Sequence, residues 1–377
     1  MSKTFYTIFP RAENFHLIKD VGMVPFILQK YYGADSTITT FKNNKDYPYI
    51  TNELNGLKID FIEQIFKSNS LNLICYILRN FKKIDILQFY HFEVNQLDII
   101  GFYIILRKIF FKKSFTYIKC DGSGRFVDTN LDIIRFKFFR KWVIKNIDLY
   151  TIETDKDFHI IKSLSNYKNI NLKIMANGFY NFKKDDDNDD EKEKVFLFVG
   201  RVGSAQKNVE LLVEAFIKFN KVNPAWKLLI VGKIEGNFNL YINSVFEENH
   251  EISNFIQIIG EVNSREELEK YYKKSAVFVL PSRYESFGIS CVEALSWGCS
   301  LILSDEVPLQ KEFENAKGVT FFKNEDENEL LNAMLLYSKN DSDKNEIDYR
   351  INFAYEHFYW PKVLKVVDDA YNISSQK

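Results

Sequence analysis

Short apolar runs alternate with helix-length segments through the second half of the sequence, and this alternation restricts the fold more than any other feature. The runs are VFLFVG (195–200), WKLLIVG (226–232), FIQIIG (255–260), AVFVLP (276–281) and CSLILS (299–304). Continuously apolar strands separated by amphipathic helices are typical of a parallel sheet with helices on both faces. We therefore predict an α/β fold here, with a helix over about 208–221 after the first run.

The first half shows a less regular version of the same pattern. Its candidate strands are TFYTIF (4–9), STITTF (36–41), IDILQFY (84–90), FTYIKC (115–120) and LYTIET (149–154). Two doubly wound α/β domains bind ligands beyond the carboxyl ends of their strands. The sequence thus predicts two Rossmann-like domains that face each other across a crevice.

One low-complexity stretch, KKDDDNDDEKEK (183–194), divides the two halves. It has no apolar residue to bury, so we interpret it as a solvated linker. The predicted domains are an N-terminal acceptor-side domain over 1–180 and a C-terminal donor-binding domain over 195–357. A charged linker over 181–194 joins them, and a closing helix over 358–377 returns to the N-terminal domain.

Composition excludes several classes of protein. No apolar run approaches the roughly 20 residues that span a bilayer, and the N-terminus lacks the pattern of a secretion signal. The cysteines, Cys75, Cys120, Cys291 and Cys299, have no paired spacing. This argues against a disulfide framework and a zinc knuckle, and it fits a reducing compartment. We expect a cytoplasmic protein.

Charge is divided unevenly along the chain. Residues 1–180 contain 26 Lys and Arg against 17 Asp and Glu, and the remainder contains 24 against 34. The segments 102–113 and 135–145 interleave these cations with Phe, Ile and Trp. They are either amphipathic helices that face the core or helices that lie on an anionic membrane. The second alternative predicts a peripheral protein on the inner face of the plasma membrane. No nucleic-acid recognition motif is present.

The stretch SRYESFGISCVEALSWG (282–298) places two glutamates, Glu285 and Glu293, around a Phe-Gly step. Gly288 lets the backbone approach a ligand, and a helix is predicted from Ile289 onward. The N-terminus of such a helix can receive a phosphate, and a carboxylate accepts hydrogen bonds from sugar hydroxyls. The pair could therefore hold two sugar-like rings on either side of a diphosphate. The spacing of the two glutamates alone would fit two ordinary surface residues equally well.

In its context, this stretch resembles the donor-site motif of retaining glycosyltransferases of family 4, which have the GT-B fold. Further segments resemble that family in the expected order. They are MANGF (175–179), Gly200-Arg201 with Lys207-Asn208, IVGKIEG (230–236), the approach to the motif over 258–282, and FYWPKVLKVVDDAY (358–371). The resemblance is specific over 195–371 and weaker before it.

The resemblance implies roles for individual residues. Arg201 and Lys207 would contact the donor diphosphate, Glu285 would bind the transferred sugar, and Glu293 would hold the ribose. Further donor contacts are assigned to Gly200, Ser286, Phe287, Gly288 and Ile289. No metal or other cofactor is expected, since the nucleotide sugar is a co-substrate. The acidic residues 185–190 lie in the predicted linker and form a solvated charge run.

The first half departs from the family pattern. Of the glycine pair expected in an early loop, DVGM (20–23) supplies only Gly22. A histidine expected after the strand FTYIKC is absent, and Asp121 is the candidate replacement, as an acceptor for a sugar hydroxyl or as a weak base. His91, at the end of another predicted strand, would face the same crevice or serve a structural role.

Taken together, the sequence predicts a retaining, metal-independent hexosyltransferase. It would move a sugar from a nucleotide-sugar donor, with a UDP-sugar favoured, to a saccharide or lipid-linked saccharide in the synthesis of a surface polysaccharide or glycoconjugate. Two alternatives remain open. One is a nucleotide-sugar epimerase of the same fold, and the other is a non-catalytic sugar-binding or partner protein.

Overall fold

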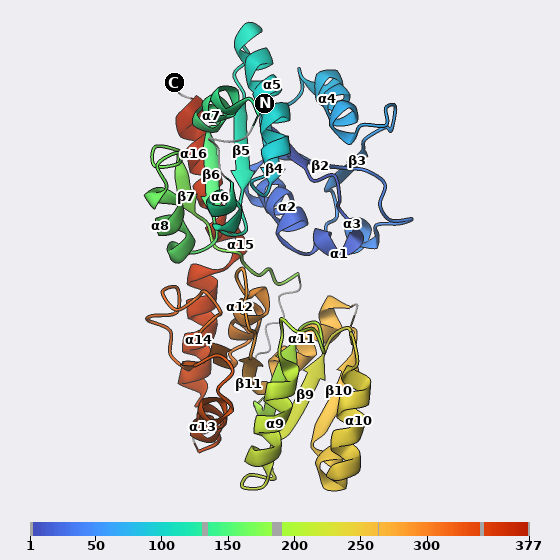
Figure 1. Ribbon diagram of the computed structural model, residues 1–377, viewed down its shortest axis with the longest axis vertical. Coiled ribbons are helices and arrows are strands. Elements are labelled where there is room, and N and C mark those ends of the chain that lie inside the picture. The colour runs from blue at the N-terminus through green and yellow to red at the C-terminus, as the bar shows by residue number, and fades with distance from the viewer. Residues whose placement is uncertain (1–2, 130–134, 183–190, 263, 340–342, 376–377) are drawn as a thin grey trace. The chain divides into compact units, whose positions relative to one another are not determined.

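The chain folds into two compact units (Figure 1). The computed structural model describes residues 3–129, 135–182, 191–262, 264–339 and 343–375. Unit 1 comprises Met1–Asn177 and Trp360–Lys377, and unit 2 comprises Gly178–Tyr359. Residues 183–190 of the predicted linker lie outside the described residues, and the first strand of unit 2 begins at Glu193, within the predicted linker.

Unit 1 contains a seven-stranded sheet in which every pairing is parallel, with the order β3-β2-β1-β4-β5-β6-β7. The strands are β1 (Thr4–Ile8), β2 (Asp35–Thr40), β3 (Lys58–Phe61), β4 (Ile86–Tyr90), β5 (Phe115–Lys119), β6 (Leu149–Ile152) and β7 (Leu172–Ile174). Because all strands run the same way, the residues that follow them gather at one edge of the sheet.

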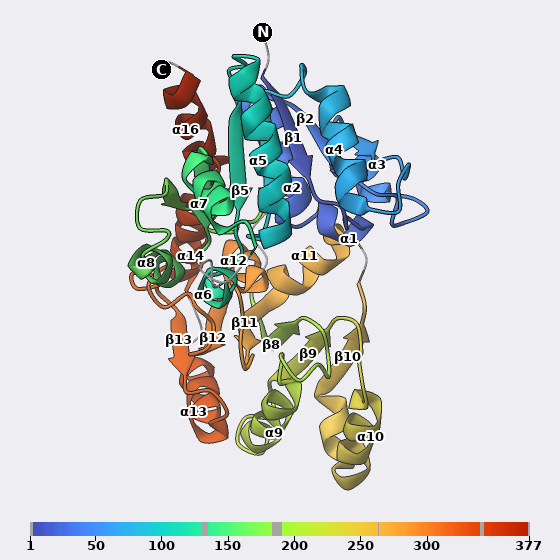
Figure 2. The same cartoon turned by 45° about the horizontal axis from the view of Figure 1, so that its top comes forward.

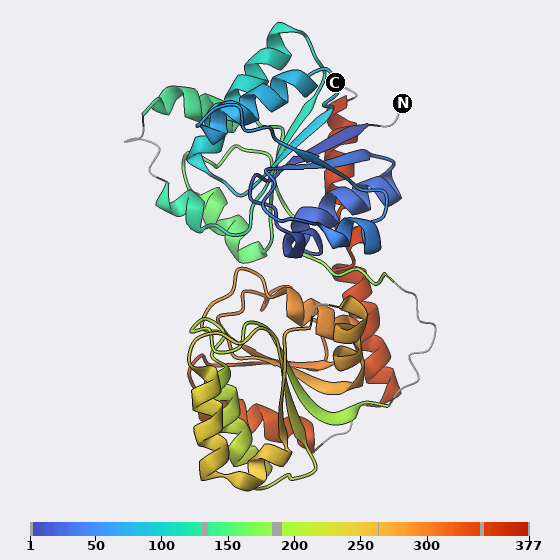
Figure 3. The ribbon, with the colours of Figure 1, turned by 90° about the vertical axis from the view of Figure 1, so that its right-hand side faces the viewer.

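Helices cover both faces of this sheet. They are α1 (Asn14–Leu17), α2 (Asp20–Tyr32), α3 (Pro48–Asn52), α4 (Asn69–Asn80), α5 (Val94–Ile109), α6 (Gly124–Asp128), α7 (Lys137–Asn146), α8 (Asp155–Ser163), α15 (Trp360–Val363) and α16 (Lys365–Ser375). Figure 3 shows this sheet edge-on, with α4 and α5 on one side and α2 and α16 on the other. The double cover explains why the strands β1, β4, β5 and β6 are almost fully apolar or buried.

Unit 2 contains a six-stranded sheet, again with only parallel pairings, in the order β10-β9-β8-β11-β12-β13. The strands are β8 (Glu193–Val199), β9 (Lys227–Val231), β10 (Ile256–Gly260), β11 (Ser275–Leu280), β12 (Ser300–Ser304) and β13 (Val319–Phe322). The helices are α9 (Val209–Asn220), α10 (Phe238–Glu248), the 3-10 helix η1 (His250–Asn254), α11 (Arg265–Lys274), α12 (Ile289–Ser296), α13 (Glu327–Ser338) and α14 (Lys344–His357). In Figure 3, α9, α10 and α13 lie on one side of this sheet, and α11, α12 and α14 lie on the other.

The predicted α/β fold with two Rossmann-like sheets is confirmed. All ten strands that we expected from apolar runs are present, and the helix expected over about 208–221 is α9. The strands that the sequence did not indicate are β3, β7 and β13. Each is an edge strand, and none has a continuously buried run of side chains.

Several helices begin at a residue whose side chain caps the first turn. In each, the side-chain oxygen accepts a hydrogen bond from the backbone N–H three residues later. The caps are Ser68, Thr154, Ser264, Asp326 and Asp343. Such a cap satisfies one of the amides that the helix leaves free at its start.

The end of the chain completes unit 1. We expected one closing helix over 358–377, but the described part of this segment is divided into α15 and α16, whose residues belong to unit 1. Trp360, Leu364 and Val367 are buried in it. Polar contacts fix both parts of the segment: the Tyr32 hydroxyl donates to the Pro361 carbonyl, and Lys3 pairs with Asp368.

Replacement of Leu364 should show how strongly this segment stabilises the fold. Leu364 is fully buried, so Leu364→Ala removes apolar contacts and leaves a cavity, with an expected loss of about 2–4 kcal/mol in the free energy of unfolding. The neighbouring exposed Lys365→Ala is the matched control and should change it by less than about 0.5 kcal/mol. Urea unfolding followed by circular dichroism measures both. Equal effects of the two substitutions would contradict the docking of this segment.

Candidate functional site

Glu285 and Lys207 form a largely buried ion pair in unit 2. Lys207 lies in the segment between β8 and α9, and Glu285 lies in the loop between β11 and α12. The Lys207 ammonium donates to Glu285 Oε1, which also accepts a hydrogen bond of 2.7 Å from the Ser282 hydroxyl. The two side chains are only 14% and 8% exposed. The structure thus brings together two of the predicted catalytic residues, which are far apart in the sequence.

The two loops that carry this pair are also joined by backbone contacts. The side-chain amide of Gln206 donates to the Tyr284 carbonyl at 2.9 Å. In the other direction, the Arg283 backbone N–H donates to the Gln206 carbonyl at 2.8 Å, and its guanidinium donates to the Ala205 carbonyl at 2.6 Å. The segment 200–208 and the loop 282–288 therefore form one rigid surface around Lys207 and Glu285.

Gly200 begins this surface at a point of close backbone approach. Its N–H donates to the Val231 carbonyl at 3.0 Å, and its own carbonyl faces Gly232. A Cβ atom on Gly232 would lie 1.7 Å from that carbonyl oxygen, and the φ angle of Gly232 is +139°. Only glycine is compatible with both facts, so Gly232 is needed for the course of the loop that follows Gly200.

Arg201 lies at the exposed side of the same loop. Its guanidinium donates to Gln206 Oε1 at 2.5 Å, and another of its nitrogens lies 3.7 Å from Glu235 Oε2. Its side chain is about half exposed. Among the described residues, one close hydrogen bond holds the guanidinium, which can therefore turn toward an anion.

The N-terminus of α12 lies three residues after Glu285. This helix begins after Gly288, whose φ angle is +95°, and no side chain of the described residues caps it. Phe287 and Gly288 are buried, Ile289 and Ser290 are half-buried, and Ser286 is exposed. The free amides of an uncapped first turn, together with the helix dipole, favour a bound anion. The predicted donor contacts Ser286–Ile289 thus surround this helix start.

Glu293, in the second turn of α12, has partners that the sequence analysis did not identify. Its Oε1 lies 2.6 Å from an Arg265 Nη1, and its Oε2 accepts a hydrogen bond of 3.1 Å from the Tyr272 hydroxyl. Burial opposes the charge of Arg265, but the Glu293 carboxylate outweighs it and raises the pKa of the guanidinium. Each Glu293 oxygen keeps a second lone pair, so the carboxylate is oriented without being saturated.

In unit 1, Gly22 does not lie in a loop, and this part of the prediction is wrong. Gly22 lies in the first turn of α2, which begins at Asp20. A Cβ atom here would lie 1.9 Å from the carbonyl oxygen of Leu17. The glycine is therefore explained by the tight passage from α1 into α2, which the short sequence DVGM did not reveal.

His91 and Asp121 are brought together at the carboxyl edge of the sheet in unit 1. His91 follows β4 directly, with a φ angle of +62°, and its backbone N–H donates to the Lys119 carbonyl at 2.8 Å. Its Nδ1 lies 3.1 Å from Asp121 Oδ1. Burial alone would raise the pKa of the Asp121 carboxyl, but His91 and Arg125 outweigh it and lower that pKa to about 2. Asp121 is therefore ionised at neutral pH.

A buried polar cluster lies next to this pair. Lys119, at the end of β5, is 2.7 Å from Glu153 Oε1 and 2.9 Å from Asp20 Oδ2. The Asn177 amide donates to the same Glu153 oxygen at 2.7 Å. One cation faces two carboxylates, and burial raises the pKa of Glu153 to about 8 despite the lowering effect of Lys119. In the sequence, only a Lys and a Glu within apolar strand ends hinted at this cluster.

Comparison with known proteins supports an assignment for unit 2. Residues 180–352 match the family model described as glycosyl transferases group 1. This region is therefore similar to the glycosyl transferases group 1 family. It contains Gly200, Arg201, Lys207, Glu285, Ser286–Ile289 and Glu293, although the match by itself does not test their individual roles. The assignment to family 4 within this group stays a prediction.

Two relatives are similar to part of the chain. An uncharacterized glycosyltransferase of Methanocaldococcus jannaschii is 29% identical over 201 residues, which are 49% of this chain and 46% of that protein. The alpha-monoglucosyldiacylglycerol synthase of Acholeplasma laidlawii is 29% identical over 181 residues, 46% of this chain and 43% of that protein. The chain thus spans less than half the length of either relative.

The whole chain resembles solved structures. The Anabaena protein HepE in complex with UDP superposes with a TM-score of 0.69 at 12% identity, over 99% of this chain and 100% of that one. At such low identity the likeness shows the fold alone, which is the GT-B fold with its two Rossmann-like sheets.

The buried cluster in unit 1 predicts a pH dependence of stability. The unfolded chain loses the Glu153 proton near the ordinary pKa of 4.5, whereas the folded chain keeps it up to about 8. Between these values the folded state binds more protons, so this group lowers the stability as pH rises. Glu153→Gln removes the titration. We expect the free energy of unfolding of the unmodified protein, relative to Glu153→Gln, to fall from about pH 5 to about pH 8.

Urea unfolding at several pH values measures this difference. Glu63→Gln, at an exposed glutamate of unit 1 that pairs with Arg79, is a control that should leave the pH profile of the difference flat. A difference between the unmodified protein and Glu153→Gln that does not change with pH would contradict the raised pKa.

Proposed function

We propose that the protein is a retaining glycosyltransferase that moves a sugar from a UDP-sugar to a saccharide or lipid-linked saccharide. The observation that carries this proposal is the buried Lys207–Glu285 pair, three residues before the uncapped N-terminus of α12, in the region similar to group 1 glycosyl transferases. To bind a sugar diphosphate, a site needs a carboxylate that accepts hydrogen bonds from the sugar hydroxyls. It also needs cations or a helix dipole that bind the phosphates.

Unit 2 binds the donor in this proposal. Glu285 accepts hydrogen bonds from hydroxyls of the transferred sugar, and the amides of Gly288 and Ile289 bind a phosphate. Glu293, oriented by Arg265 and Tyr272, uses its remaining lone pairs for the ribose hydroxyls. Gly200 and Ser286 line the same surface.

In the transfer step, the bond between the anomeric carbon and the diphosphate oxygen breaks, and the acceptor oxygen bonds to the same face of that carbon. The acceptor proton passes to the departing phosphate. Negative charge builds on the diphosphate, and Lys207 and Arg201 stabilise it. Fixed charges of this kind contribute about 10²–10³-fold to a rate, and we propose that they do so without a metal ion.

Unit 1 binds the acceptor. With its pKa lowered to about 2, Asp121 is a poor base at neutral pH, and we therefore assign it as an acceptor for a hydroxyl hydrogen bond. His91 lies beside it and orients the same hydroxyl. We also propose that Gly22, in the first turn of α2, contacts the donor.

A panel of UDP-, GDP- and ADP-sugars, with and without EDTA, tests the proposed function. We expect one preferred donor, a UDP-sugar, whose slow hydrolysis and transfer are unaffected by EDTA. The support for UDP is the fold shared with HepE, which is solved with UDP. Failure to bind or hydrolyse any donor would overturn the proposal, and conversion of the donor sugar without an acceptor would favour an epimerase.

Glu285→Gln should then lower the rate of transfer at least about 100-fold, because the amide cannot replace a carboxylate that both holds Lys207 and accepts sugar hydroxyls. Glu314→Gln is the matched control, since Glu314 is an exposed glutamate of the same unit that pairs with Lys311. Nucleotide binding should remain in both variants. Equal transfer rates would exclude Glu285 from catalysis.

We also propose that unit 1 associates with an anionic membrane. No helix in the described residues is long and apolar enough to cross a membrane. The helices α5 and α7 lie side by side (Figure 2), and exposed aromatic side chains lie next to cations just after the end of α5 and within α7. Phe111 is 93% exposed beside Lys113, and Phe138 is 81% exposed beside Lys137. Aromatic groups that enter the interface and cations near it bind anionic lipids. The lipid product in the name of the Acholeplasma relative supports this proposal.

Vesicle sedimentation tests the membrane proposal. Phe111→Ser combined with Phe138→Ser should reduce binding to vesicles that contain anionic lipid at least about tenfold, since two apolar anchors are lost. Leu240→Ser is the matched control, because Leu240 is 70% exposed in unit 2 and should leave binding unchanged. Binding that is the same for all three proteins would contradict the proposal.

A further inference from the structure

The outer edge of the unit 1 sheet at β3 takes no part in the chemistry described above. β3 is the last strand in the sheet order, and among the described strands it pairs with β2 alone (Figure 1). Lys58, Asp60 and Phe61 are exposed, and Ile59 is half-buried. The outer row of backbone N–H and C=O groups of such a strand can pair with a strand of another chain.

The register of β3 determines which of its backbone groups point outward. In a parallel pair, the N–H and C=O groups of alternate residues point to the same neighbouring strand. The Ile62 N–H donates to the Thr40 carbonyl at the end of β2 at 2.8 Å, so the groups of Asp60 and Lys58 also point to β2. The N–H and C=O groups of Ile59, in the middle of β3, therefore point away from the sheet.

A second copy of β3 is complementary to this edge. When two copies run antiparallel with a two-fold axis at Ile59, the outward N–H and C=O groups of Ile59 pair with those of the partner's Ile59. Lys58 then lies opposite the partner's Asp60, and Asp60 lies opposite the partner's Lys58. These are the positions without backbone hydrogen bonds, where opposite side chains are closest. Opposite charges at such positions stabilise the pairing.

Both charged side chains lie on the face of the sheet that α4 covers. The Tyr76 hydroxyl of α4 donates to Asp60 Oδ2 at 2.6 Å and so orients the carboxylate. Side chains alternate between the faces along a strand, and Lys58 therefore lies on the same face as Asp60. Its ammonium is 2.6 Å from Asp35 Oδ1. Because Lys58 is exposed, the ammonium can contact a partner's carboxylate from this position.

A groove beside Asp60 has room for the partner's lysine. It has a volume of about 240 Å³ and lies between the end of β3 with the residues that follow it and α4. Its polar lining includes two carboxylates, Asp60 and Glu63, and one cation, Arg79. The Arg79 guanidinium donates to Glu63 at 2.6 Å and neutralises it. Asp60 therefore leaves the groove with an excess of negative charge, which a lysine of the second copy balances.

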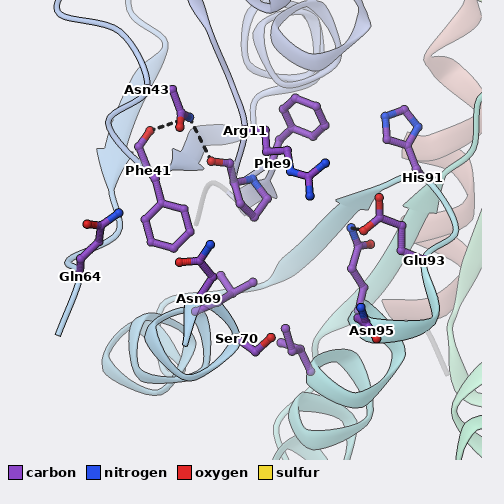
Figure 4. A pocket seen from close by; sticks show the side chains of 14 residues that line it. Phe9, Arg11, Phe41, Asn43, Gln64, Asn69, Ser70, His91, Glu93 and Asn95 are labelled. Atoms are coloured by element: carbon purple, nitrogen blue, oxygen red, sulfur yellow. Dashed lines mark hydrogen bonds between the residues drawn. The ribbon is translucent and has the colours of Figure 1, made fainter. Parts of the chain in front are cut away.

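This groove is separate from the pocket that Figure 4 shows. Gln64, Asn69 and Ser70 line the pocket in Figure 4, whereas Glu63 and Asn72 line the groove. The two cavities share no lining residue among those described. A second copy that covers the groove therefore does not have to fill the pocket.

Exposed apolar side chains lie around the same edge. Phe61 and Ile65 line the groove, Phe66 follows them in the chain, and Leu71 and Leu78 lie on α4. All five side chains are exposed. Exposed apolar groups that are gathered beside polar ones mark surfaces for protein association. A strand as short as β3 needs such a surface, because its few hydrogen bonds alone would not hold two chains together.

We propose that the protein forms a symmetric dimer in which two copies of β3 pair antiparallel about Ile59 and join the two unit 1 sheets. Such an interface uses the same surface on both chains. The order of the charges selects a second copy in this direction, since an in-register parallel copy would place Lys58 opposite Lys58. At the other edge of the sheet, β7 has Lys173 at its centre, so two antiparallel copies of β7 would bring like charges together. The dimer does not depend on the proposed transfer.

The first experiment changes the charges and measures the dissociation constant of the full chain by sedimentation velocity over a range of micromolar concentrations. Lys58→Glu places like charges opposite each other twice and should raise the dissociation constant at least about tenfold. Lys58→Glu combined with Asp60→Lys restores opposite charges and should return it to within about threefold of the unmodified value. Lys173→Glu is the control, because it makes the same charge change at the other edge strand.

Each outcome of this experiment decides the proposal. An unmodified protein that stays monomeric throughout the range would overturn it. A dimer that Lys173→Glu dissociates and Lys58→Glu leaves intact would show that another surface is used. Loss of association in Lys58→Glu and its return in the double variant would support pairing through β3.

The second experiment removes the central hydrogen bond. The N–H of Ile59 points away from β2, so Ile59→Pro removes a donor at the outer edge and leaves the hydrogen bonds to β2 in place. We expect Ile59→Pro to stay folded and to raise the dissociation constant at least about tenfold. Ile59→Val keeps the N–H and is the matched control, which should associate like the unmodified protein. Circular dichroism verifies that both variants are folded. A folded Ile59→Pro variant with an unchanged dissociation constant would overturn the pairing.

Discussion

The ion pair between Lys207 and Glu285 determines the form of the donor-side surface. Both charges are largely removed from water, and such a pair is stable only if further hydrogen bonds satisfy it. Ser282 supplies one to Glu285, and the contacts of Gln206 and Arg283 hold the two loops at the distance that the pair requires. Loss of either charge leaves the other buried and unpaired. The arrangement thus couples the position of a sugar-binding carboxylate to that of a phosphate-binding cation.

The sequence predicted the sheet cores well, since a strand covered on both faces must be apolar along its whole length. The strands β3, β7 and β13 lacked that signal because most of their side chains are not fully buried, so these strands need no continuous apolar run. The motif around Glu285 was also recognisable, because Gly288 and the two glutamates have a fixed spacing along one loop and helix. By contrast, Gly22 was misplaced: a glycine in a short polar context fits a loop and the first turn of a helix equally well.

Partners that come from distant parts of the chain could not be predicted. Arg265 and Tyr272 reach Glu293 only because α11 lies next to α12 in space. The cluster of Lys119, Glu153, Asp20 and Asn177 likewise joins four segments through strand order. In the sequence these residues look like ordinary polar interruptions. Their burial, and therefore the raised pKa of Glu153, follows from the topology of the sheet and not from any local pattern.

The division of unit 1 into two segments has a consequence for biosynthesis. Its last part, Trp360–Lys377, follows all of unit 2, so the ribosome must translate residues 178–359 before α15 and α16 exist. At 5–20 residues per second, this interval lasts roughly ten to forty seconds. During it, the side of unit 1 that later receives Leu364, Val367 and the ring of Tyr371 faces water. The nascent protein therefore presents an apolar surface to chaperones until α15 and α16 have left the ribosome.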